Sequence, residues 1–252
     1  MHTVSRPADA HRALLRGALA TAIALGLLLA GLATVLAERG GLSHAFVPKT
    51  LAVFAIGVAL VLAALPAHLP RQRFGPANRV TLARLGLVSL LAAMLGEGVA
   101  SVAWPAVAIA TLAAVLDAVD GRLARRTGLA SPFGARFDME TDALLMLVLA
   151  LLAWQLGKAG GWIVAAGLLR YAFVGAGRAW RWLERPLPPS LRRKAICVIQ
   201  IITLIVALAP IIPVAASEVI AGAGLALLVC SFAVDVAWLR RRAGDPLMET
   251  AS

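Results

Sequence analysis

The sequence predicts an all-α integral membrane protein, a bundle of about eight transmembrane helices with both termini in the cytoplasm. Hydrophobic residues make up 61% of the 252 residues and charged residues only 15%, which is more apolar surface than one soluble core can bury. Apolar runs of about 18 to 22 residues recur, each long enough to cross a hydrocarbon layer of roughly 30 Å as a helix. Basic residues gather in every second connection between these runs.

The first two runs cover residues 17–37 and 49–67 and belong to a predicted N-terminal extension, residues 1–69. The first run follows Arg16 and ends in small residues, so a cleaved secretory signal peptide is the alternative interpretation. The run is long for a signal peptide, and its removal would invert the charge pattern of the remaining connections. The extension ends at the connector PAHLPRQRFGPANRV, whose prolines and glycine are typical of a break between helices.

Six further runs predict a helical core at residues 70–242, followed by a short cytoplasmic tail at residues 243–252. In chain order, these runs are 80–96, 99–118, 138–156, 161–182, 195–213 and 218–239. The proline-rich connector RWLERPLPPSLRRK separates runs 161–182 and 195–213, because its prolines cannot continue a helix. Cys197 and Cys230 lie in different runs without disulfide or metal-ligand spacing, and we interpret them as packing residues.

The net charge of +11 could indicate a nucleic-acid partner, but the distribution of the basic residues indicates membrane topology instead. With eight spans and a cytoplasmic N-terminus, only Arg39, Lys49 and Lys158 of the 24 Lys and Arg fall on the outer side. The inner side carries all the others, which also suits anionic lipid headgroups. We therefore expect a multi-pass protein of the bacterial inner (plasma) membrane, in contact with the lipid bilayer and not with nucleic acid.

Four of the seven aspartates fall in one segment, DAVDGRLARRTGLASPFGARFDMETD, which joins run 99–118 to run 138–156 on the cytoplasmic side. On helices, Asp117 and Asp120 share one face, as do Asp138 and Asp142, and the two pairs can face each other. Four carboxylates repel unless cations neutralise them, and such oxygen ligands suit Mg²⁺ or Mn²⁺. The segment predicts a site for these metals, with two ions expected; helix caps or a solvated loop are the alternative.

Small residues accompany the acids on both predicted helix faces. Gly121 and Ala124 would leave the surface shallow beside the first acidic pair, and Gly134 would do so beside the second. A bulky ligand could lie on such a surface, while ordinary close helix packing is the alternative for the glycines. Arg125 could pair with a phosphate, although positive-inside topology also accounts for an arginine here.

These residues match the pattern D-x2-D-G-x2-A-R-x8-G-x3-D-x3-D, by which the sequence resembles the CDP-alcohol phosphotransferases (CDP-alcohol phosphatidyltransferases). The fixed positions are Asp117, Asp120, Gly121, Ala124, Arg125, Gly134, Asp138 and Asp142. The resemblance extends over about residues 71–240, since the family core is a six-helix membrane bundle preceded by a cytoplasmic interfacial segment. The segment NRVTLAR also resembles an Asn-x-x-Thr-x-x-Arg pattern common in the family, matched by Asn78, Thr81 and Arg84.

The resemblance implies a metal-dependent enzyme of phospholipid biosynthesis. Such an enzyme transfers a phosphatidyl group from CDP-diacylglycerol to the hydroxyl of a small alcohol and releases CMP. The resemblance implies Asp117, Asp120 and Asp138 as the principal metal ligands, and Asp142 as a further ligand and as the base that deprotonates the acceptor. The residues implied in binding the CDP-lipid are Gly121, Ala124, Arg125, Gly134, Asn78 and Thr81.

The acceptor is indicated by three basic residues. Arg170 lies well inside an apolar run, where a charge usually faces a polar cavity or a partner. With Arg193 and Lys194 it could form a pocket for a phosphorylated acceptor, although these bases could also simply mark the inner membrane face. The segment RRKAICVIQ resembles the corresponding entrance in phosphatidylglycerophosphate synthases, which implies glycerol 3-phosphate as the acceptor. The same chemistry with inositol phosphate, serine or choline is the alternative.

The sequence also bears on the role of the two N-terminal helices, on two alternative functions and on two histidines. The two N-terminal helices could pack on the core, support a homodimer like those typical of the family, or engage another membrane partner. A membrane cation transporter is an alternative function, but the acids lie at helix ends rather than near the bilayer midplane. An inert scaffold is a further alternative, but it would have no physical need for four mutually repelling carboxylates.

His44 and His68 lack ligand-like spacing and are interpreted as interfacial residues without a functional role.

Overall fold

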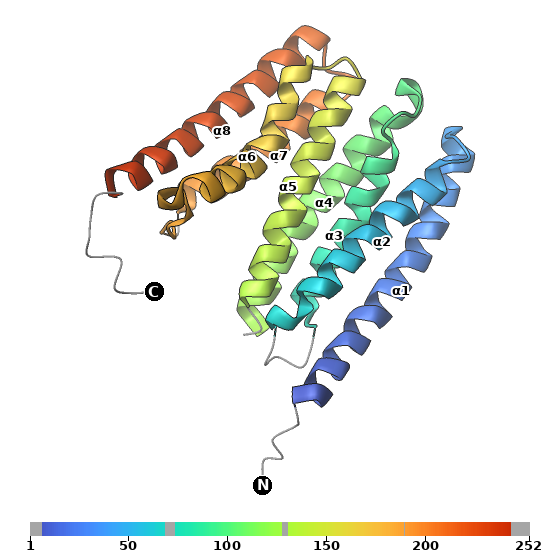
Figure 1. Cartoon of the computed structure of the whole chain (residues 1–252). Helices are drawn as coiled ribbons and strands as arrows, with labels where there is room; N and C mark the ends of the chain where they lie inside the picture. Colours follow the sequence, from blue (N-terminus) through green and yellow to red (C-terminus); the bar gives the residue numbers. More distant parts are fainter. Residues whose placement is uncertain (1–6, 69–73, 128–130, 189, 243–252) are drawn as a thin grey trace. The chain divides into compact units, whose positions relative to one another are not determined.

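The computed structural model is built from α-helices (Figure 1). It describes the backbone of residues 7–68, 74–127, 131–188 and 190–242, and the side chains of these ranges apart from 7–10, 120 and 122–127. The predicted cytoplasmic tail, residues 243–252, lies outside these ranges. Within the described ranges there is no β-strand, which confirms the all-helical fold class.

The described residues form eight α-helices, and each predicted apolar run overlaps one of them. In chain order, they are α1 (Pro7–Gly40), α2 (Phe46–Ala64), α3 (Pro76–Ala93), α4 (Val99–Thr127), α5 (Pro132–Gln155), α6 (Ala165–Ala179), α7 (Leu191–Leu208) and α8 (Val214–Arg242). Three short 3₁₀ helices lie between them: η1 (Leu65–His68), η2 (Gly161–Val164) and η3 (Arg181–Glu184).

Four of the described helical segments are long and apolar enough to cross a membrane. They are His11–Gly40, Phe46–His68, Val99–Val119 and Val214–Arg242. Large apolar side chains are exposed along them, such as Leu27 and Ile56, where a soluble protein would carry polar residues. The other helices are shorter or carry charged residues in their first turns, so hydropathy alone does not identify them as spans. The chain is a membrane protein, and the full count of eight spans stays a prediction.

The chain divides into two compact units, with the boundary inside α5. The N-terminal unit extends to Val148 and contains α1 to α4 with the first part of α5. The C-terminal unit begins at Leu149 and contains the end of α5 with α6 to α8. All three aspartates described below lie in the N-terminal unit.

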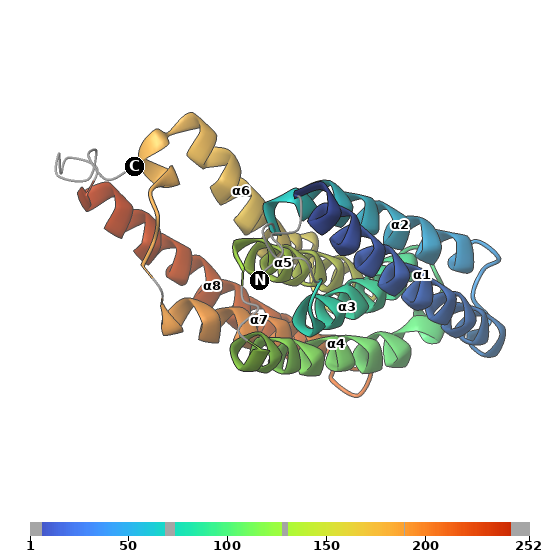
Figure 2. The ribbon, with the colours of Figure 1, turned by 90° about the horizontal axis from the view of Figure 1, so that it is seen from below.

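In the N-terminal unit, α1 and α2 form a hairpin that packs on α3 (Figure 2). Glycines allow the close approach: a Cβ atom on Gly86 of α3 would lie 2.7 Å from Leu29 Cδ1 of α1. Likewise, a Cβ atom on Gly57 of α2 would lie 2.8 Å from Leu85 Cδ2 of α3. Small residues at such contacts let membrane helices pack at short distance. Of the three roles left open for the N-terminal helices, packing on the core is therefore observed.

A buried carboxylate joins this hairpin to the turn between α3 and α4. Glu97 Oε2 accepts a hydrogen bond from Ser43 N at 2.8 Å, and Oε1 accepts one from Ser43 Oγ at 2.6 Å. Lys49 Nζ lies 3.3 Å from Glu97 Oε1. Burial raises the pKa of Glu97, but the hydrogen bonds from Ser43 and the Lys49 ammonium together outweigh it, so the pKa lies below its ordinary value.

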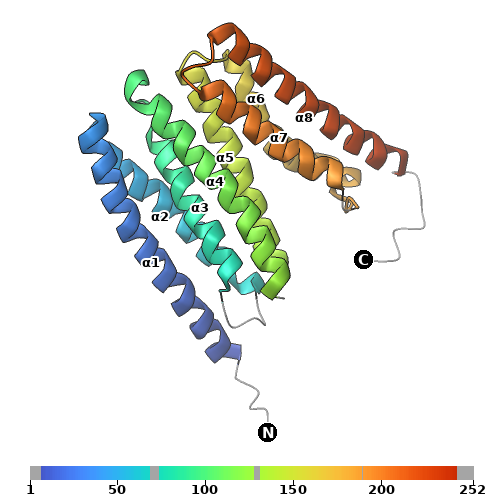
Figure 3. The same ribbon diagram turned by 180° about the vertical axis from the view of Figure 1, so that it is seen from behind.

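In the C-terminal unit, α7 and α8 pack side by side and are joined by a short turn (Figure 3). Lys158 Nζ donates hydrogen bonds to the carbonyl oxygens of Ala209 at 3.0 Å and Ile212 at 2.6 Å. These carbonyls follow the end of α7, where helical backbone acceptors have no partner within the helix. A Cβ atom on Gly224 of α8 would lie 2.8 Å from Gln200 Oε1 of α7, so this pair of helices also meets at a glycine.

Candidate metal centre

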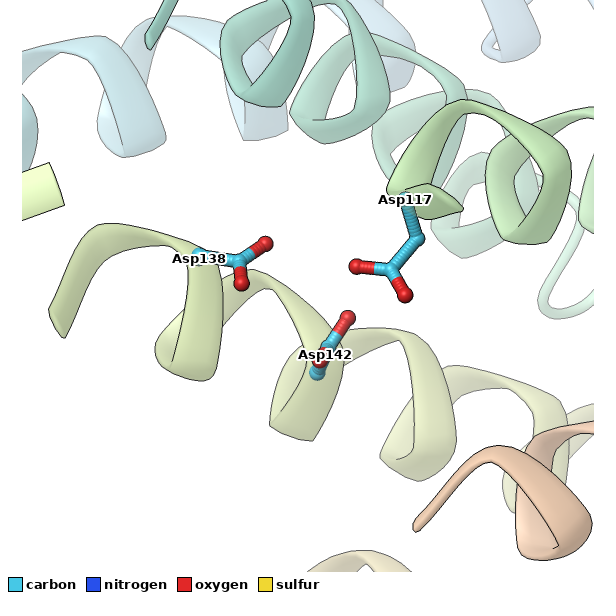
Figure 4. Close-up of side chains that lie close together, drawn as sticks. All are labelled: Asp117, Asp138 and Asp142. Atoms are coloured by element: carbon cyan, nitrogen blue, oxygen red, sulfur yellow. The ribbon is translucent and has the colours of Figure 1, made fainter. Parts of the chain in front are cut away.

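Three of the four predicted aspartates converge between α4 and α5. Asp117 extends from the C-terminal half of α4, and Asp138 and Asp142 extend from α5, with the carboxylates directed toward one another (Figure 4). One carboxylate oxygen from each residue lies within 4.8 Å of the others. The side chains are 29%, 39% and 18% exposed for Asp117, Asp138 and Asp142, so a small ion can reach all three.

The helical repeat explains this convergence. Gly134, Asp138 and Asp142 follow one another at intervals of four residues and therefore line one face of α5. Gly121 lies four residues after Asp117 and therefore on the same face of α4. The side chains of three other predicted site residues lie outside the described residues. They are Asp120, Ala124 and Arg125.

A buried arginine lies at the centre of the cluster. The Arg84 side chain, 1% exposed, extends from α3, and its Nη1 lies 2.9 Å from Asp117 Oδ1 and 2.5 Å from Asp138 Oδ1. Its Nη2 donates a hydrogen bond to Asp142 Oδ1, and its Nε donates one to the carbonyl oxygen of Ala113 at 3.2 Å. One guanidinium thus contacts all three carboxylates, and its planar set of donors suits this arrangement.

Sequence reasoning included Arg84 in a family pattern but gave it no role in the site. A signal was present, because an arginine within an apolar helix is costly unless acidic or carbonyl groups surround it. The arginine was predicted to lie near the start of a membrane helix, and the positive-inside rule offered a simpler explanation. Only the packing of α3 against α4 and α5 identifies its partners.

The donor set fits a divalent metal. Three carboxylates face a single guanidinium, which leaves an excess of negative charge among groups less than 5 Å apart. Carboxylate oxygens are hard ligands, and Mg²⁺ and Mn²⁺ are commonly bound by a few such groups together with water or substrate phosphates. The partial exposure of the three carboxylates leaves room for a substrate to complete the coordination.

Asn78 and Thr81 lie on the first turns of α3, and both are buried. Asn78 Nδ2 donates a hydrogen bond to the carbonyl oxygen of Phe74 at 2.6 Å, and Thr81 Oγ1 donates one to that of Ala77 at 3.1 Å. A Cβ atom on Gly134 would lie 2.9 Å from Asn78 Oδ1, so a glycine is needed where α5 meets α3. These contacts explain helix packing, and binding of a nucleotide here stays a prediction.

The predicted acceptor-binding residues lie in the C-terminal unit. Arg170 is half-buried in α6, and Arg193 and Lys194 occupy the first turn of α7, where Lys194 is exposed. Arg193 Nη1 lies 3.2 Å from Asp235 Oδ1 of α8. Asp235 is buried and also pairs with Arg192, whose Nη2 lies 2.5 Å from the same oxygen. The sequence did not indicate this pairing, because the partners belong to different helices.

Comparison with known sequences agrees with the architecture and with the acidic cluster. The sequence model of the family described as CDP-alcohol phosphatidyltransferase matches residues 74–234. The match begins just before α3 and ends within α8, so it includes the aspartate cluster and leaves the α1–α2 hairpin outside. No curated protein and no solved structure shows a significant match. The matched segment covers well over half of the sequence, and the chain belongs to the CDP-alcohol phosphatidyltransferase family.

Proposed function

We propose that the protein transfers a phosphatidyl group from CDP-diacylglycerol to glycerol 3-phosphate and releases CMP. Phosphatidyl transfer from a CDP-alcohol is the chemistry of the family to which the chain belongs. The observation that carries the proposal is the cluster of Asp117, Asp138 and Asp142 around Arg84, because it brings together three of the four aspartates of the family pattern in an arrangement that suits a metal ion. The identities of the donor lipid and of the acceptor are the proposed part.

The metal ligands in this proposal are Asp117, Asp120, Asp138 and Asp142, and they would hold Mg²⁺ or Mn²⁺, with two ions expected. When bound, such ions neutralise pyrophosphate charge, make the attacked phosphorus more electrophilic and offset the charge on the departing CMP. Arg84 keeps the carboxylates together by contacting Asp117, Asp138 and Asp142. The protein thus contributes chiefly positioning and electrostatic stabilisation.

Asp142 is the proposed general base. Its side chain is the least exposed of the three described carboxylates, which limits competition from water for the proton-accepting oxygen. Asp142 takes the proton of the acceptor hydroxyl as the acceptor oxygen forms its bond to the β-phosphorus. The bond from that phosphorus to the bridging pyrophosphate oxygen breaks, and CMP leaves with the electron pair. No covalent enzyme intermediate is required.

The proposed contacts to the CDP-lipid come from small residues beside the acids and from polar residues at the start of α3. They are Gly121, Ala124, Arg125, Gly134, Asn78 and Thr81. Support comes from the arrangement of α3 and α5, where Gly134 faces Asn78 and the missing Cβ atom leaves room beside Asn78 Oδ1. For the acceptor phosphate we propose Arg170, Arg193 and Lys194.

The remaining parts of the proposal concern the setting of the enzyme. Eight spans with both termini inside would make it a multi-pass protein of the bacterial inner membrane, with the aspartates facing the cytoplasm. That orientation gives the site access to a water-soluble acceptor. A homodimer is the proposed assembly, in line with the family.

The test is an assay of the purified chain with CDP-diacylglycerol, Mg²⁺ or Mn²⁺, and a panel of acceptors. The panel contains glycerol 3-phosphate, inositol phosphate, serine and choline, and both CMP release and the lipid product are measured. We expect metal-dependent CMP release with glycerol 3-phosphate and formation of the matching phospholipid. Turnover with a different acceptor would replace glycerol 3-phosphate in the proposal, and absence of turnover with every acceptor would contradict the enzyme itself.

A further inference from the structure

His68 ends the helical hairpin that lies outside the family-matched segment, and it contacts the start of α5. The residue closes η1 directly after α2 and is only 1% exposed. Its Nδ1 lies 2.9 Å from Ser131 Oγ, a hydrogen bond whose donor depends on the imidazole tautomer. Its ring centroid lies 5.3 Å from that of Phe133. A histidine interpreted from sequence as interfacial is therefore buried against the helix that carries Asp138 and Asp142.

Ser131 immediately precedes α5. Its Oγ accepts a hydrogen bond from Gly134 N at 3.0 Å, and its carbonyl oxygen accepts one from Ala135 N at 3.0 Å. A serine with these two bonds is an N-cap, and the following Pro132 is favoured at the first helical position. Because the N-cap fixes where the first turn starts, His68 contacts the group that sets the start of α5.

Phe133 connects the same histidine to the rotation of α5 about its axis. Phe133 and Phe137 are buried and four residues apart, with ring centroids separated by 6.1 Å. Gly134 and Asp138 occupy the neighbouring positions on the helix surface, one residue further along the chain. Holding Phe133 against His68 therefore also fixes the direction in which Asp138 and Asp142 point.

We infer that His68 is a positioning residue for the aspartate cluster, acting through Ser131 and Phe133. It sets the start and rotation of α5 and so directs Asp138 and Asp142 toward Asp117. This gives the α1–α2 hairpin a part in the active site, although the hairpin lies outside the matched family segment. The catalytic consequence rests on the proposed function, whereas the effect on metal binding does not.

The experiment measures Mn²⁺ binding to the purified, metal-stripped full chain by electron paramagnetic resonance, together with CMP release. The test variants are His68→Ala, His68→Asn and Ser131→Ala. Asparagine places an amide near the position of imidazole Nδ1 and can keep the hydrogen bond to Ser131. His44→Ala is the matched control, because His44 is an exposed histidine in the turn at the other end of α2.

We expect His68→Ala to weaken Mn²⁺ binding about 10-fold, the lower end of the losses seen when groups that orient metal ligands are removed. His68→Asn should recover most of the affinity, and His44→Ala should leave it unchanged. In a Ser131→Ala background the His68→Ala change should weaken Mn²⁺ binding much less, because His68 acts through its contact with Ser131. The turnover number should follow Mn²⁺ occupancy across these variants.

A purely structural role for His68 would give a different result. His68→Ala would then lower the melting temperature while Mn²⁺ affinity stayed at the wild-type value, and this outcome would overturn the inference. Equal losses in His68→Ala and His68→Asn would do the same. If His68→Ala does not fold, the other two variants decide the test. The inference then requires that Ser131→Ala weakens Mn²⁺ binding and that His68→Asn retains it. If the wild-type chain binds Mn²⁺ but releases no CMP, the proposed function is rejected. The Mn²⁺ affinities of the His68 variants still decide the inference in that case.

Discussion

At the scale of single residues, the unusual group is the guanidinium of Arg84. It is buried within a helical bundle and contacts three carboxylates that belong to two other helices. An ion cluster of this kind is costly to desolvate, and its loss leaves uncompensated charge in the interior. Arg84 and a bound divalent metal therefore act on the same three carboxylates, and each reduces the repulsion among them.

The first prediction concerns Arg84→Ala. In the presence of EDTA we expect this variant to lose about 3 to 5 kcal/mol of stability, the usual cost of removing one partner from a buried ion pair. Mg²⁺ should recover more stability in the variant than in the wild type, because the metal then has to balance the carboxylates without the arginine. The stability of Arg84→Lys should lie between those of the wild type and Arg84→Ala, since a single ammonium cannot reproduce the planar guanidinium contacts. Thermal melting with and without Mg²⁺ measures these differences, and an equal Mg²⁺ effect in all three proteins would contradict the explanation.

The second prediction concerns the proposed base. Asp142→Asn should lower the turnover number by at least about 100-fold, the contribution typical of a general base, while leaving a folded protein. Glu140→Gln is the matched control, because Glu140 is an exposed acid of the same helix between the two aspartates. CMP release with CDP-diacylglycerol and the identified acceptor gives the rates, and near wild-type turnover in Asp142→Asn would reject this residue as the base.

The residues of the site differ in how far the sequence revealed them. Asp138 and Asp142 are four residues apart and Asp117 and Asp120 three apart, so the helical repeat placed each pair on one helix face and predicted that the pairs could face each other. The hydrogen bond between His68 and Ser131 joins positions 63 residues apart, and no local pattern specifies such a pairing. Contacts of this kind depend on how whole helices are rotated and placed, which hydropathy and spacing do not determine.

At the scale of helices, the α1–α2 hairpin is attached to the core at both ends of α2. Near the start of α2, Ser43 and Lys49 hold the carboxylate of Glu97, and after its end His68 contacts Ser131. Between these points the glycines of α2 and α3 allow the helices to approach closely. The hairpin is therefore a fixed part of the N-terminal unit.

The third prediction is a pH dependence at Glu97. The folded-state pKa lies below the ordinary value of 4.5, so the ionised carboxylate stabilises the fold fully above that value. This contribution is lost as the pH falls from 4.5 through the lower folded-state pKa. Glu97→Gln should therefore lower the melting temperature at pH 7, and the difference from wild type should shrink below pH 4.5. A difference in melting temperature that is constant from pH 7 to the most acidic condition tested would refute this assignment.

At the scale of the whole molecule, the sequence predicted more spans than hydropathy of the described helices identifies by itself. Four described segments qualify as spans from length and composition. The other helices are shorter or contain charged residues, among them the functional groups Arg84 in α3 and Asp138 in α5. A functional site at helix ends thus obscures the signal by which membrane spans are recognised, whereas the alternation of basic connections is unaffected.

The fourth prediction tests that alternation. In a chain whose Cys197 and Cys230 are replaced by alanine, His44→Cys should react with a membrane-impermeant maleimide on intact cells, because the turn after α1 is predicted to lie outside. Arg181→Cys, in the basic connection after α6, should react only after the cells are opened. Both positions are exposed, so their accessibility depends on the side of the membrane and not on burial. Labelling of Arg181→Cys on intact cells would contradict the eight-span topology.

The double attachment of the hairpin also has a consequence for biogenesis. Polypeptides emerge from the ribosome starting at the N-terminus, so Ser43, Lys49 and His68 are made before Glu97 and Ser131, the groups that they bind. During insertion the hairpin is thus already present when the later helices enter the bilayer. The hairpin can in this way serve as an intramolecular template on which the nascent catalytic segment assembles.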